Sequence, residues 1–187
     1  MKNQIYIALL LLVVTILIAC KPSQDPAQPD DAKNVLDEAA ETEAIMNVIK
    51  GETDCFFKGD YECWAKHWSH EKYAVQAWNN DNGTADAAVG WDKINAQGKG
   101  WIEKYYKNGK VVIHPVVKRE PPLVKFFNDK SAYLIWKQYN AESLKTHFRT
   151  SHEMRIMEKE TDGWKIVNVS ALWDTQAKIP FDSLEIN

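Results

Sequence analysis

The sequence lacks a strong excess of charge of either sign, because 23 basic and 26 acidic side chains leave a formal net charge of −3. Proteins that bind nucleic acid through its phosphates carry a clustered excess of lysine and arginine. We therefore expect no nucleic-acid partner. The longest apolar run, Ile5 to Ala19, is shorter than the roughly 20 residues that a membrane-spanning helix requires. We therefore do not expect this run to span a membrane.

The same run follows a short basic start, Met1-Lys2, and ends in Leu17-Ile18-Ala19-Cys20. A basic start followed by an apolar stretch is typical of an export signal. In position, length and final cysteine it resembles a bacterial lipoprotein signal. The resemblance implies that residues 1–19 are a signal peptide and that Cys20 carries acyl chains. Two or three such chains anchor a protein stably. The domain would then lie outside the cytoplasm in the cell envelope, at the outer membrane if the source is Gram-negative.

The remaining chain divides into three parts. Residues 20–34 hold the lipidated cysteine and three prolines but no large apolar side chain, which predicts a disordered tether. Residues 35–175 are expected to form one domain, because the 45% apolar content of the chain is enough for a core. Residues 176–187 are expected to be a C-terminal tail, with Phe181 packing onto the domain.

Helical patterns precede strand patterns within this domain. Apolar residues at helical spacing cover 35–57, a shorter helix follows Asp60, and a third helix is predicted from Asp92 to Tyr106. Strand patterns begin near Val111, and the two longest flank the turn at Asp162-Gly163 within residues 145–174. This order predicts an α+β fold in which a curved antiparallel sheet wraps around the N-terminal helices.

Several short motifs in this order resemble the nuclear-transport-factor-2-like superfamily, which includes polyketide-cyclase-like and ketosteroid-isomerase-like proteins. The motifs are Lys58-Gly59-Asp60-Tyr61-Glu62, Gly90-Trp91-Asp92-Lys93-Ile94, Ala132-Tyr133 and Gly163-Trp164-Lys165-Ile166-Val167-Asn168. The resemblance covers about Asp37 to Trp173. It implies a cone with a pocket between the helices and the sheet, but no single function, because this fold serves enzymes, binding modules and assembly domains.

Strand alternation places His152 on the same face as Met154 and Ile156. If that face lines the pocket, His152 lies near Asn168 and Ser170 of the next strand. His152 is then a candidate general base, with Asn168 as its partner in catalysis. A hydrogen-bonded core histidine is the other interpretation of this residue.

Tryptophan is abundant, with eight in the chain. Aromatic side chains at helix and strand positions are candidates for the wall of a pocket that binds an apolar or ring-shaped ligand. An alternative is that they only fill the core. The candidate lining residues are Trp64, Trp68, Tyr73, Trp101, Tyr105, Trp136 and Ser170.

Cysteine is scarce, with three in the chain, and Cys55 and Cys63 stand eight residues apart at the junction of two predicted helices. Outside the cytoplasm such a pair can form a disulfide, and two buried thiols are the alternative. His67 and His70 are three residues apart but have no evident third ligand. We expect no metal and no cofactor.

These observations lead to three functional hypotheses. The first is a lipid-anchored module outside the cytoplasm that binds a small apolar or aromatic ligand, or a protein partner, without catalysis. The second is a pocket isomerase, cyclase or hydrolase that uses His152 as general base. The third is an assembly module that forms a homodimer through the sheet. Partners are thus expected to be the membrane, through Cys20, and a small molecule or protein.

Overall fold

The computed structural model describes residues 36–106, 114 and 116–186. The predicted signal peptide, Cys20 and tether lie outside the described residues, as do positions 111–113 and 115 of the strand predicted from Val111. None of the helices in the described ranges combines the length and the apolar character needed to cross a bilayer.

The helices begin and end at residues whose local chemistry favours a boundary. The side chain of Asp37 accepts a hydrogen bond from the Ala40 amide at 3.1 Å and caps the first helix. Gly59 ends that helix in the left-handed conformation, with φ of 72°, and Asp60 caps the next by accepting from the Cys63 amide at 3.0 Å. The helices are α2 (Glu38–Lys58), α3 (Tyr61–Ala65), α4 (Trp91–Trp101), the π-helical η1 (Ile102–Tyr106) and the 3₁₀ turn η2 (Phe181–Ser183).

Seven strands form one curved sheet in the order β2-β1-β7-β6-β5-β3, and β4 also pairs with β5. All pairs are antiparallel except β1 and β7, which run parallel, so the sheet is mixed rather than wholly antiparallel. The predicted α+β class is confirmed. The strands are β1 (Val75–Asn79), β2 (Ala85–Val89), β3 (Val117–Arg119), β4 (Leu123–Asn128), β5 (Ser131–Ala141), β6 (His147–Glu160) and β7 (Gly163–Pro180).

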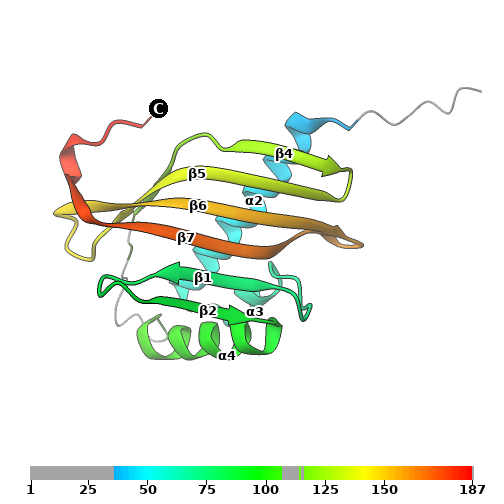
Figure 1. Ribbon diagram of the computed structural model, residues 1–187, viewed down its shortest axis with the longest axis horizontal. Coiled ribbons are helices and arrows are strands. Elements are labelled where there is room, and N and C mark those ends of the chain that lie inside the picture. The colour runs from blue at the N-terminus through cyan, green and yellow to red at the C-terminus, as the bar shows by residue number, and fades with distance from the viewer. Residues whose placement is uncertain (1–35, 107–113, 115, 187) are drawn as a thin grey trace, which may run out of the picture. The chain divides into compact units, whose positions relative to one another are not determined.

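Helix α2 crosses behind the sheet, and we call the sheet face toward α2 the inner face and the opposite one the outer face (Figure 1). The main core lies between α2, α3, α4 and the inner face. Its largest side chains are almost fully buried and include Trp64, Trp68, Ile94, Leu134 and Ile166. Residues from both halves of the chain thus form one apolar core, which fixes the helices against the sheet.

A β-bulge in β7 changes which residues face the core. Met157 of β6 pairs with Ile166, whereas Ile156 pairs with Asn168, so Val167 has no partner in the ladder. An unpaired residue reverses the alternation of a strand. Trp164 and Ile166 therefore face inward before the bulge, while the inward residues after it are Val169, Ala171 and Trp173.

The segment predicted to be a tail begins as part of the sheet, because β7 continues to Pro180. The Phe181 ring then stacks on Phe148 of β6, with centroids 4.9 Å apart. The Lys118 ammonium donates to the Leu184 carbonyl at 2.9 Å. The structured domain therefore extends beyond the predicted boundary at residue 175.

Candidate functional site

A cavity of about 730 Å³ lies against the inner face of the sheet. Its lining comes from α2, from η1 and the end of α4, from β1 and the loop after it, and from β5, β6 and β7. Pockets that bind small molecules are typically 300–1,000 Å³, with mostly apolar walls and a few placed polar groups. The volume therefore suits a small molecule.

Aromatic rings form much of the cavity wall. Trp78 of β1 and Trp101 of α4 have ring centroids 5.2 Å apart, and Phe56 of α2 meets Trp101 edge-on at 6.3 Å. His114 stacks on Trp173 of β7 at 5.6 Å. These contacts hold the rings in fixed positions around the cavity.

A chain of hydrogen-bonded side chains on β5 and β6 runs beneath the cavity, and three of its members, Gln138, Asn140 and Glu153, form part of the cavity floor. The Trp136 indole donates to Gln138 Oε1 at 3.4 Å, and the Gln138 amide donates to Asn140 Oδ1 at 3.0 Å. The Asn140 amide reaches Ser151 Oγ at 3.4 Å, and the Ser151 hydroxyl donates to Glu153 Oε1 at 2.6 Å. All five side chains are buried, so each interaction is formed in a region of low dielectric.

The chain of polar groups ends in an ion pair, because Glu153 Oε2 lies 2.9 Å from Nη1 of Arg155. The two residues are only 2% and 7% exposed. The Arg155 guanidinium also lies over the Trp136 ring, 5.0 Å from its centroid. Burying a charge is costly unless it is paired, so Glu153 and Arg155 each depend on the other to remain charged in the cavity wall.

A second guanidinium supports the same floor. Arg119 of β3 donates from Nε to Gln138 Oε1 and from Nη2 to Thr53 Oγ1, both at 2.9 Å. Burial lowers the pKa of Arg119, and the positive charge of Arg155 lowers it further. The Trp136 indole, over which Arg155 lies, donates to the same Gln138 oxygen, so the two guanidiniums contact one cluster of side chains.

His114 is a titratable lining residue that the sequence patterns did not single out. Its Nδ1 lies 3.0 Å from the Ala141 carbonyl oxygen. The neutral ring donates to this oxygen when it carries its proton on Nδ1. Burial lowers the pKa of His114, and the nearby charge of Arg149 acts in the same direction. Arg149 itself forms an ion pair with Asp81 and lies over the Trp173 ring.

The predicted catalytic pair is not in this cavity. His152 is exposed, and it shares the outer face with Asn168 and Ser170. The expectation that these three residues point into the pocket is wrong. Two causes combine: the inward face of β6 is the one carrying Ser151, Glu153 and Arg155, and the bulge at Val167 puts Asn168 and Ser170 on the other side from Ile166.

The predicted aromatic lining residues divide into three groups. Trp101 and Tyr105 line the cavity, and their role in binding stays a prediction. Trp64, Trp68 and Trp136 are core residues, at most 3% exposed, and do not line it. Tyr73 is 49% exposed outside the cavity, and its hydroxyl donates to Glu158, which raises the pKa of Tyr73 to about 12.

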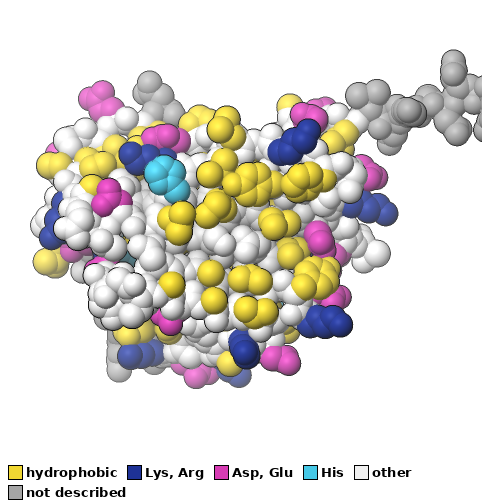
Figure 2. All heavy atoms as spheres, in the orientation of Figure 1, with side chains coloured by type: hydrophobic (Ala, Val, Ile, Leu, Met, Phe, Trp, Pro, Cys, Tyr) yellow, Lys and Arg dark blue, Asp and Glu magenta, His cyan; other side chains and the backbone are white. Residues whose placement is uncertain are grey.

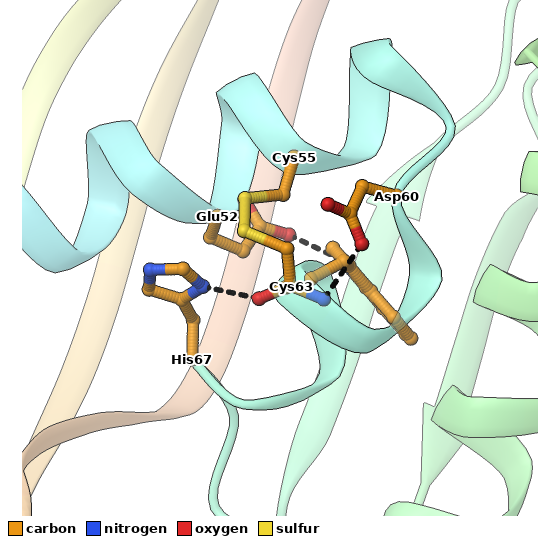
Figure 3. The surroundings of a disulfide bond; sticks show 6 residues. Glu52, Cys55, Asp60, Cys63 and His67 are labelled. Carbon is orange, nitrogen blue, oxygen red and sulfur yellow. Dashed lines mark hydrogen bonds between the residues drawn. A yellow bond between two sulfur atoms is a disulfide. The ribbon is translucent and has the colours of Figure 1, made fainter.

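Cys55 and Cys63 form a disulfide that joins α2 to α3, with Cα atoms 5.5 Å apart (Figure 3). His67 lies beside them, and its Nδ1 is 2.7 Å from the Cys63 carbonyl oxygen. The two sulfurs and a ring nitrogen of His67 lie within 4.8 Å of one another. Cys55 and Cys63 could bind a metal only as thiolates, however, and sulfurs joined in a disulfide are not thiolates.

Comparison with known proteins defines the fold. No family model matches the sequence, and no curated protein matches it. An NTF2-like protein with a cystatin-like fold from Novosphingobium aromaticivorans superposes with a TM-score of 0.56 at 18% identity, over 80% of this chain and 94% of that one. An NTF2-like protein of unknown function from Shewanella oneidensis gives a TM-score of 0.54 at 17% identity, over 70% and 98%. The chain therefore has the nuclear-transport-factor-2-like fold.

Proposed function

We propose that this protein is a binding module that holds a small amphipathic molecule in its cavity without transforming it. The cavity itself is the observation that carries the proposal. Its aromatic wall suits the apolar body of a ligand, and its polar floor suits one hydrogen-bonding end. Because His152 lies on the outer face, the cavity does not contain the base on which the enzyme hypothesis depended.

Mass spectrometry of the full-length protein, extracted in mild detergent, tests this proposal. We expect a small molecule to accompany the wild-type protein. Ala171 lines the cavity, so Ala171→Phe should fill part of it and release the molecule. Ala39→Phe makes the same change at an exposed position on α2 and should retain it. Equal retention by both variants would place the molecule elsewhere. A wild-type protein that carries nothing and binds no added probe would overturn the proposal.

We also propose that the protein forms a homodimer through the outer face. The exposed apolar side chains there include Val89, Ile156 and Leu172, at 52%, 39% and 55% exposure. Figure 2, in the orientation of Figure 1, shows hydrophobic side chains spread across this face. Two cross-strand rows carry no charge, namely Tyr133–Ile156–Asn168–Val75–Val89 and Ile135–Met154–Ser170–Ala77–Ala87. An uncharged area of this kind, bordered by Lys125 and Lys137, favours pairing with its own copy about a two-fold axis.

The third part of the proposal is the lipid anchor on Cys20, which places the domain in the cell envelope. It is supported by the leader pattern alone, in residues outside the described part of the chain. A disulfide between Cys55 and Cys63 agrees with an oxidising compartment outside the cytoplasm.

A further inference from the structure

The charged groups around the cavity differ in how many of their hydrogen-bonding positions are occupied. The carboxylates already have partners: Glu153 accepts from Ser151 on one oxygen and pairs with Arg155 through the other. Glu52 accepts from the Trp64 indole at 2.8 Å, and Asp81 pairs with Arg149. Two of the three carboxylates that line the cavity, Glu153 and Asp81, are therefore already paired with an arginine.

The guanidinium of Arg155 is less fully engaged. Its Nη1 contacts both Glu153 and the Met154 carbonyl oxygen at 2.9 Å. Its Nε is buried without a hydrogen-bond partner. Within residues 36–106, 114 and 116–186 its side chain makes no hydrogen bond or ion pair beyond the two at Nη1. A guanidinium has five N–H donors, so most of those on Arg155 remain available. Arg155 is 7% exposed and lines the cavity, which leaves the cavity as its route to a further partner.

Arg119 adds a second positive charge to the floor, because its Nε donates to the same Gln138 oxygen as the Trp136 indole, over which Arg155 lies. Both of its recorded hydrogen bonds go to neutral groups, Gln138 and Thr53, and no carboxylate within the described residues forms an ion pair with it. The floor thus combines two neighbouring guanidiniums with a single directly bonded carboxylate, Glu153. An anion at this position would reduce the repulsion between the two arginines.

We infer that the ligand carries a carboxylate, which the floor of the cavity binds through Arg155 with Arg119 behind it, while the aromatic wall holds an apolar or ring-shaped body. This inference rests on the proposed binding function and names the chemical class of its ligand. Arginine suits this role because its planar array of N–H groups matches the two oxygens of a carboxylate.

Matched acids and amides test the inference. The probes are phenylacetate with phenylacetamide, and 2-naphthylacetate with 2-naphthylacetamide, titrated by calorimetry into the full-length protein in detergent micelles, with protein-free micelles subtracted. We expect at least one acid to bind tenfold or more tightly than its amide. Arg155→Gln should remove most of that preference. Lys137→Gln removes the same charge from the outer face of β5 and should preserve it.

Arg155→Gln leaves Glu153 buried without its partner and can fail to fold. The double variant Glu153→Gln/Arg155→Gln removes both charges and should also lose the preference for the acid. The comparison of acid with amide on the wild-type protein needs no variant at all. Equal affinity for acid and amide would overturn the carboxylate assignment and leave the binding function standing. No binding of any probe, together with no co-purified molecule, would overturn both.

Discussion

Gly98 of α4 lies against the ring of Trp64. A Cβ atom at position 98 would come within 2.2 Å of the Trp64 ring, and the indole is fully buried and bonded to Glu52, so it has little freedom to move. Overpacking a core in this way typically costs about 1–3 kcal/mol.

We therefore predict that Gly98→Ala lowers the free energy of unfolding by about 1–3 kcal/mol in urea denaturation. Gly100→Ala is the matched control, because a Cβ there meets nothing within 4 Å and alanine favours helix by about 1 kcal/mol. If the two variants were equally stable, Trp64 would not pack against α4 as described.

His114 predicts a dependence of stability on pH. Its pKa in the folded protein lies below the usual 6.5, because burial and Arg149 outweigh the opposing effects of the Ala141 carbonyl and Glu153. Between the folded pKa and 6.5 the unfolded chain binds a proton that the folded protein does not. The stability that this depressed pKa contributes is therefore fully present above pH 6.5. It decreases as the pH falls below 6.5 and is lost once the pH has fallen through the folded pKa.

His114→Phe preserves a ring beside Trp173 and removes this titration. We expect the stability of the wild-type protein to fall more steeply than that of His114→Phe as the pH drops below 6.5, in urea denaturation at a series of pH values. Parallel curves for the two proteins would show that His114 is solvated and not buried in the cavity wall.

At the scale of the element, the Cys55–Cys63 disulfide closes a short loop between α2 and α3. A loop of this length is expected to stabilise the fold by about 2–3 kcal/mol, by restricting the unfolded chain. Reductant should lower the free energy of unfolding by that amount in the wild-type protein and leave the Cys55→Ser/Cys63→Ser variant unchanged. A wild-type protein that is insensitive to reductant under unfolding conditions would mean that the two thiols are free.

Elements differ in how well their sequence predicts them. Helix α2 and strands β6 and β7 are long, so their repeating patterns are clear, and the α+β fold follows from their order. The bulge at Val167 involves one residue and leaves no mark in the pattern, yet it decides which side chains face inward. That is why Asn168 and Ser170 were predicted on the wrong face.

The polar floor could have been predicted from the sequence pattern, but the position of His114 in the cavity could not. Arg149, Ser151, Glu153 and Arg155 alternate along β6 on the face opposite His152, a row of polar residues that fits a pocket floor better than a core. Choosing between the two faces required knowing which one α2 covers. His114 reaches the cavity through contacts with Phe57, Trp173 and Ala141, all distant in the sequence, which no local pattern encodes.

At the scale of the whole molecule, the proposed dimer gives a direct prediction. Leu172→Lys places a charge on the outer face beside the uncharged row that contains Ser170, where burying it in an interface would be costly. We expect this variant to be monomeric in size-exclusion chromatography with light scattering, and the wild-type protein to be dimeric. Leu144→Lys makes the same change at an 80% exposed position between β5 and β6 and should remain dimeric. A monomeric wild-type protein would contradict the proposal.

The lipid anchor is tested by Cys20→Ala in the full-length chain. We expect the wild-type protein to sediment with membranes and to gain the mass of its acyl chains after loss of residues 1–19. The variant should show neither the acyl mass nor this cleavage, since both require the cysteine. Acylation that persisted in the variant would show that Cys20 is not the attachment point.

Strand β7 is the last strand to be synthesised, yet it lies in the interior of the sheet, between β1 and β6. While the ribosome is still making residues 163–180, the β1–β2 hairpin and the β3–β6 segment have no strand to connect them. Each of these partial sheets presents an open edge, which is prone to pairing with other chains. The complete sheet can therefore close only after residues 163–180 have been synthesised, because among the described strands β7 supplies the only pairing between its two parts.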